Sequence, residues 1–141
     1  MSAAAASVAA LTDAFLADWQ IELARWLIVS CFLLNGLFNC VPHRVTEHVQ
    51  RLQQFGTPLA LPIFWAGIAM QLLSCSLIIL GWQARLGVIG LMLFLLLATL
   101  LFHRFWRMPD EARRNLARIN VMNNCAIFGG LLLLLQHTSR G

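Results

Sequence analysis

The sequence predicts an all-α fold, a four-helix transmembrane bundle with short amphipathic helices at the membrane interface. The first observation is a set of four long, almost uncharged apolar runs, near residues 22–41, 59–80, 86–103 and 119–135. Each run is close to the roughly 20 residues that a helix needs to cross a bilayer. The second is the composition: 60% of the 141 residues are hydrophobic and only 11% are charged, against about 25% charged residues in soluble domains. Mean hydropathy is +0.74.

The chain before the first run is expected to be a tail followed by a surface helix, over residues 1–21. Val8, Leu11, Phe15 and Trp19 recur at helical spacing, with acidic residues between them. This pattern is typical of a short helix that lies on the membrane surface, and a helix continuous with the first run is the alternative. Residues 22–141 are predicted to form one four-helix domain.

The connections between the runs carry their own signals. In the first connection Val45, Val49 and Leu52 repeat at three- and four-residue spacing among polar residues, before Gly-Thr-Pro at 56–58. This predicts an amphipathic helix that packs over the bundle. The five-residue link 81–85 makes the second and third runs antiparallel neighbours, and Asp110-Glu111 after a proline predicts the start of the last helix.

Small residues indicate where helix backbones could approach closely. Gly87 and Gly90 share one face of the third run. In the fourth run Cys125 and Gly129 are four residues apart, as are Ala126 and Gly130. Such pairs favour close helix packing in lipid.

All ten basic residues are Arg, and the formal net charge is +4. Since they flank the apolar runs, we expect lipid headgroups rather than nucleic acid as their partners. The headgroup contacts are assigned to Arg104, Arg107, Arg113 and Arg114. The first and third connections together carry seven Arg residues and the opposite side carries three. The positive-inside rule then places the seven-Arg side in the cytoplasm and both termini outside.

Polar residues inside the runs are the candidates for a functional site. Two interpretations stay open: the amides bond neighbouring helices and fix their register, or they line a cavity for a headgroup, a quinone or a small polar ligand. His103 is the titratable residue within a run, while His43 and His48 are placed on the same side but outside the core. The cysteines lie in apolar runs without a CxxC motif, so neither disulfides nor a metal site built from them is expected. The three His residues on one side lack a paired spacing on facing helices, so haem is not expected either. The tentative ligand-binding cluster is Asn35, Asn39, Gln71, His103, Asn120, Asn123 and Asn124.

Four motifs, running from about residue 22 to 136, resemble the DoxX family of small four-helix bacterial membrane proteins. They are RWLIVSCFLLNGLFN from Arg25, the Gly-x-Pro at 56–58, LFHRFW at 101–106, and NNCAIFGGLLLL at 123–134. Three positions that are charged in the family pattern are neutral amides here: Asn39 and Asn123 replace Lys, and Gln71 replaces Glu. An amide keeps a hydrogen bond but cannot move a proton.

The resemblance implies a membrane subunit linked to redox systems. With the charges neutralised, a non-catalytic role is favoured: an accessory subunit of a larger respiratory or photosynthetic membrane complex, with lipids and other membrane subunits as partners. The alternative is a membrane subunit of a quinone-linked oxidoreductase such as thiosulfate:quinone oxidoreductase, acting near Asn39, Gln71, His103 and Asn124. A further alternative is a small-molecule transporter or lipid-binding protein. No resident cofactor is expected, though a quinone or lipid would suit the cluster, and the bacterial inner membrane is favoured over an organellar one.

Overall fold

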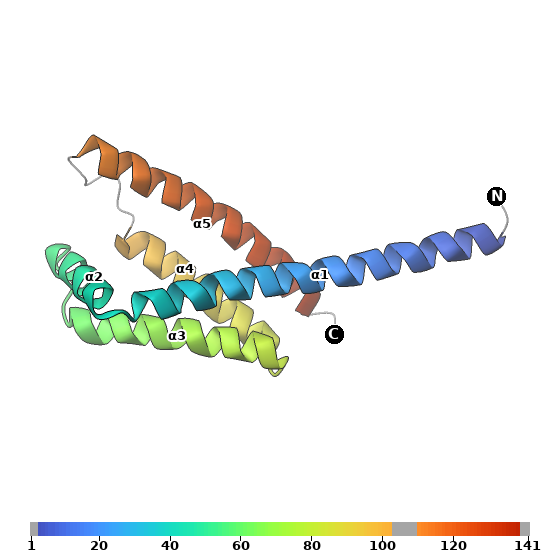
Figure 1. Cartoon of the computed structure of the whole chain (residues 1–141), viewed down its shortest axis with the longest axis horizontal. Helices are drawn as coiled ribbons and strands as arrows, with labels where there is room; N and C mark the ends of the chain where they lie inside the picture. The colour runs from blue at the N-terminus through green and yellow to red at the C-terminus, as the bar shows by residue number, and fades with distance from the viewer. Residues whose placement is uncertain (1–2, 103–109, 139–141) are drawn as a thin grey trace.

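The computed structural model describes residues 3–102 and 110–138, and this part of the chain is helical (Figure 1). The helices are α1 (Ala3–Asn39), α2 (Pro42–Gln54), α3 (Ala60–Leu80), α4 (Ala84–Phe102) and α5 (Glu111–Thr138). Within the described residues, four segments are long and apolar enough to cross a membrane: Asp18–Asn39, Ala60–Leu80, Ala84–Phe102 and Glu111–Thr138. The predicted all-α class with four candidate spans and an added amphipathic helix is confirmed.

The surface helix expected before the first span is not a separate element. α1 is one helix of 37 residues, so it is about 55 Å long at 1.5 Å per residue, nearly twice the roughly 30 Å hydrocarbon core. The physical reason is that residues 3–35 contain no Gly or Pro to interrupt the helix. The N-terminal half of α1 therefore projects beyond the other helices (Figure 1).

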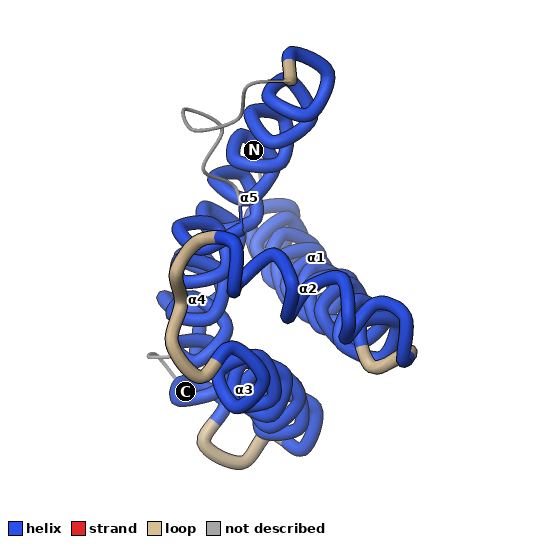
Figure 2. The backbone as a smooth tube through the Cα atoms, turned by 90° about the vertical axis from the view of Figure 1, so that its left-hand side faces the viewer, coloured by secondary structure: helices blue, strands red, loops and turns tan. Residues whose placement is uncertain are grey.

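The amphipathic helix predicted after the first span is present as α2. It begins at Pro42, where the missing N–H of proline costs nothing, and ends just before Gly56, whose φ of 72° turns the chain. Leu52 is buried, and Val45 and Val49 pack with it against the cluster that includes Phe64. α2 thus lies across one end of the bundle (Figure 2).

α3 and α4 form the most closely packed pair, joined by the short turn at 81–83. A Cβ added at Gly87 would lie 2.7 Å from the backbone oxygen of Ser74, and one at Gly90 would collide with the Ser74 side chain. The predicted close approach at these two glycines is confirmed. The main apolar core lies between α1, α3, α4 and the C-terminal half of α5, and includes Val29, Cys75, Leu91 and Leu131.

The small residues of α5 behave differently from one another. A Cβ at Gly130 would lie 3.4 Å from Ile28 of α1, whereas one at Gly129 would meet nothing within 4 Å. Cys125 is also exposed. The predicted packing face at Cys125 and Gly129 is wrong. Neighbouring helical positions differ by about 100°, so Gly130 faces α1 and Gly129 does not.

Candidate functional site

A cavity of about 600 Å³ lies between the helices, and all five contribute to its lining. This volume falls within the range of about 300–1,000 Å³ that is usual for small-molecule sites. Phe32, Phe94 and Leu95 are among the apolar side chains that form most of its wall. The cavity reaches the molecular surface, since Cys31 and Ile63 line it and are themselves exposed. Its polar lining residues are Asn35, Asn39, His48, Arg51, Gln71, Asn120 and Asn124.

Five of the seven residues predicted from the sequence therefore meet around one space, although they come from three helices. They are Asn35, Asn39, Gln71, Asn120 and Asn124. Asn123 is exposed on α5 and does not line the cavity, because one step along a helix turns a side chain by about 100°. His103 lies outside the described residues.

Gln71 is the most deeply placed polar residue of the cavity, with 0% of its surface exposed. Its amide nitrogen donates a hydrogen bond of 2.6 Å to the backbone oxygen of Phe32 in α1. Gly36 makes room for this contact, because a Cβ there would lie 3.3 Å from Gln71 Cδ. The amide oxygen of Gln71 is buried and has no hydrogen-bond partner. A buried acceptor of this kind is costly unless a ligand or water bonds it.

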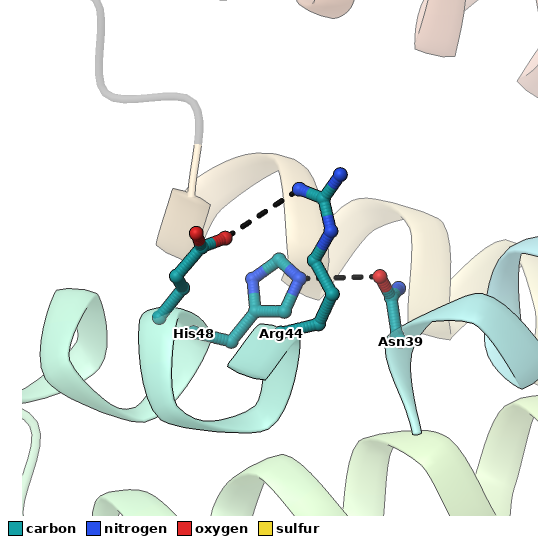
Figure 3. Close-up of polar contacts among 4 residues, drawn as sticks. Asn39, Arg44 and His48 are labelled. Atoms are coloured by element: carbon teal, nitrogen blue, oxygen red, sulfur yellow. Dashed lines mark hydrogen bonds and ion pairs between the residues drawn. The ribbon is translucent and has the colours of Figure 1, made fainter. Parts of the chain in front are cut away.

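At the α2 end of the cavity, His48 and two asparagines form a hydrogen-bonded chain. Asn39 Nδ2 donates to Asn35 Oδ1 at 2.8 Å, and His48 Nε2 lies 3.2 Å from Asn39 Oδ1 (Figure 3). The His48 ring stacks on Phe64 at 5.7 Å and meets Phe102 edge-on at 5.3 Å.

His48 lies on α2, outside the candidate spans as expected, but it is half-buried and lines the cavity, which was not predicted. His48 follows Val45 by three residues and precedes Leu52 by four, so it shares the apolar face of α2 that packs on the bundle. The periodicity that predicted α2 could have identified it. Burial, followed by the positive charge of Arg51, lowers the pKa of His48 from 6.5, while Glu47 opposes this and Arg44 adds to it. The ring is therefore held in its neutral form at neutral pH.

Asn124 supports the first interpretation of the amides, that they join helices. Its Nδ2 donates to Thr99 Oγ1 of α4 at 2.8 Å, and that hydroxyl donates in turn to Leu95 O at 2.7 Å. This bond fixes α5 against α4 beside the cavity. The cluster thus combines helix-joining bonds with a lined space, and the two interpretations do not exclude each other.

Of the four arginines assigned to lipid headgroups, Arg104 and Arg107 lie outside the described residues. Arg113 and Arg114 are exposed in the first turn of α5, and Arg113 Nε lies 3.5 Å from Asp110. In the part of the chain that the structure describes, no group of three His, Cys, Asp or Glu residues could hold a metal ion. All four cysteines are free thiols.

The family of the chain follows from comparison with known proteins. The DoxX family model matches residues 21–104, more than half of the chain. The chain belongs to the DoxX family. The motif at 123–134 lies beyond the matched residues, and the other three motifs lie wholly or largely within them. As a DoxX protein with four candidate spans, it is a membrane protein.

A more distant likeness is to the Surfeit locus protein 4 homolog of Schizosaccharomyces pombe, which is 31% identical over 78 residues. The match covers 52% of the DoxX chain but only 26% of that relative, so the chain spans about a quarter of the relative's length. No solved structure matches the chain.

Proposed function

We propose that this DoxX protein binds a small amphipathic molecule from the lipid phase and holds it without transforming it. The observation that carries the proposal is the cavity of about 600 Å³. The cavity opens to the surface at Cys31 and Ile63, so a molecule of the lipid phase can enter it, and its volume is in the range that is usual for small-molecule sites.

The lining favours binding over catalysis. The walls are mostly apolar, and the polar groups are four asparagines, one glutamine, His48 and Arg51. None of the described lining residues is a carboxylate, and amides neither give up nor take up protons. A lipid or a quinone has the required apolar body and polar end, and both reach the cavity from the bilayer.

A cavity-filling variant and a matched control test this function. Ala98 of α4 lines the cavity, whereas Ala69 of α3 is exposed and does not. Protein purified in nanodiscs is extracted, and lipids and quinones are quantified by mass spectrometry. We expect one species enriched at close to one molecule per wild-type chain, retained in Ala69→Phe and lost in Ala98→Phe. Equal amounts in all three folded proteins would refute the proposal.

A second candidate function is that of an accessory subunit in a larger respiratory or photosynthetic complex. The favouring observation is the N-terminal half of α1, which projects from the bundle (Figure 1) and leaves Leu11 and Phe15 each 71% exposed. Such a face suits a neighbouring membrane subunit. Leu11→Gln with Phe15→Gln should shift the protein from a large species to its own mass on native gels, while Leu133→Gln on α5 should not. A wild-type protein that migrates alone would exclude this role.

The membrane and the orientation are part of the same proposal. We place the protein in a bacterial cytoplasmic membrane, with α2 and the start of α5 on the inner side because these carry the Arg-rich connections. Cysteine accessibility in intact cells, measured at an introduced Cys near Glu47, tests the orientation. Labelling by an impermeant reagent added outside would reverse it.

A further inference from the structure

Two buried polar atoms lack a hydrogen-bond partner among the described side chains, and both belong to residues that line the cavity. They are Gln71 Oε1 and His48 Nδ1. Backbone and side-chain partners are found for nearly all buried polar groups in native proteins. Their meeting in one cavity points to a ligand that supplies the missing bonds.

The orientation of the Gln71 amide is decided by its neighbour. The nitrogen lies 2.6 Å from Phe32 O, and the reversed amide would place two oxygens in that contact, where they repel each other. Gln71 Oε1 is therefore the free atom, and an amide oxygen can only accept a hydrogen bond.

The hydrogen bonds of Asn39 assign the roles of the two His48 nitrogens. Asn39 Nδ2 donates to Asn35 Oδ1, so the Asn39 oxygen faces the imidazole. In this arrangement His48 Nε2 carries the proton and donates to that oxygen. In the neutral ring the other nitrogen, Nδ1, has a lone pair and is an acceptor. Both unpartnered atoms are therefore hydrogen-bond acceptors, and a ligand would have to supply the donors.

We propose that the occupant is a lipid-phase alcohol or phenol whose hydroxyl donates a hydrogen bond to Gln71 Oε1. This inference rests on the proposed function, since it requires the cavity to be occupied. The apolar body lies against the Phe32 and Phe94 side of the wall. Gln71 is seven residues from Phe64, the ring on which His48 stacks, and seven residues correspond to a rise of about 10 Å along α3, so the two acceptors lie at different levels of the cavity. His48 accepts from a second donor at the α2 end.

Two sources offer this chemistry, an isoprenoid hydroquinone and a diacylglycerol. The test uses a matched pair for each: a short-chain hydroquinone with its quinone, and dioctanoylglycerol with its 3-O-methyl ether. In each pair the second member loses the hydroxyl hydrogen; the quinone keeps the size of the hydroquinone, and the ether adds one methyl group. Binding to the full chain in nanodiscs is measured by titration calorimetry, for wild type, Gln71→Met and Gln136→Met. Gln136 is an exposed glutamine of α5 outside the cavity and serves as the control.

We expect wild type and Gln136→Met to prefer the hydroxyl member of at least one pair by about tenfold, and Gln71→Met to bind both members equally. A preference in one pair identifies the source, and a preference in both supports the shared hydroxyl chemistry. If wild type binds ligand but shows no preference within either pair, the inference is overturned while the proposed function stands. A preference that survives in Gln71→Met also overturns it. If wild type binds no member and retains no lipid on purification, the proposed function itself fails.

Discussion

Replacing Gln71 with methionine should separate stability from binding, because in the empty protein the bonded amide nitrogen stabilises the fold whereas the unpartnered oxygen destabilises it. Methionine is unbranched, similar in length and flexible, so it fills the same space. The substitution removes the hydrogen bond to Phe32 O. That carbonyl lies inside α1 and, in a regular helix, also accepts the N–H of the residue four positions on. It is therefore not left without a partner.

The magnitude follows from the two terms. A side-chain hydrogen bond between membrane helices contributes about 0.6 kcal/mol, with a maximum near 1.7. The unpartnered Gln71 Oε1 costs about 1–3 kcal/mol. In ligand-free protein Gln71→Met should therefore change stability by between a loss of about 0.7 kcal/mol and a gain of about 2.4 kcal/mol. Gln71→Ala, which leaves a void instead, should lower stability by about 2 kcal/mol or more.

Lipid-stripped protein unfolded by SDS titration in mixed micelles gives these differences directly. The same variants are then assayed for ligand retention, where Gln71→Met should be impaired despite its stability. A loss of more than about 1.7 kcal/mol in empty Gln71→Met, beyond what one such bond contributes, would show that the amide oxygen is already satisfied within the protein. The case for a donating ligand would then fall.

Three further predictions follow from the described contacts. Gly87→Ala should be less stable than Gly129→Ala by about 1–3 kcal/mol in the same unfolding assay, because helix propensity favours both equally and only the first overpacks the α3–α4 contact; equal stabilities would contradict this. Gly36→Ala places a Cβ 3.3 Å from Gln71 Cδ, so ligand retention should fall at least about twofold. The free energy of unfolding should change little. Burial lowers the pKa of His48 from 6.5, so as the pH falls the unfolded chain takes up the proton before the folded protein does. The contribution of His48 to protein stability is therefore complete above that pH and is lost below it. His48→Phe should reduce this loss of stability at acid pH.

The span positions and α2 could be predicted from the sequence because they depend on local patterns. Uncharged runs locate the spans, and the spacing of Val45, Val49 and Leu52 locates α2. The continuity of α1 was predicted only as the alternative, because a polar face on residues 8–19 suits a separate surface helix and a continuous helix equally. Only the absence of Gly and Pro before Gly36 separates the two.

The residue types of the site could be predicted from the sequence, but the rotation of each helix about its axis could not. Asn124 and Asn123 are equally polar in the sequence, and the packing of α5 on α4 alone decides that Asn124 bonds Thr99 while Asn123 faces outward. The spacing of Val45, His48 and Leu52 places His48 on the apolar face of α2, but its contact with the Phe64 ring depends on α2 folding back over α3. Such facts depend on tertiary contacts that no short window of sequence contains.

The resemblance to the DoxX pattern implies a glutamate at position 71, and the glutamine found there is compatible with the proposed binding. At a site with no exposed surface, a carboxyl group is held neutral, because burying its charge without a partner is very costly. A neutral carboxyl donates through its O–H and accepts through its carbonyl, and the amide of Gln71 offers the same pair: a donor toward Phe32 O and a free acceptor in the cavity. What the amide cannot do is release the proton. The substitution thus keeps the hydrogen-bond pattern of the site and removes proton transfer, as expected of a protein that holds a hydroxyl-bearing ligand and leaves it unchanged.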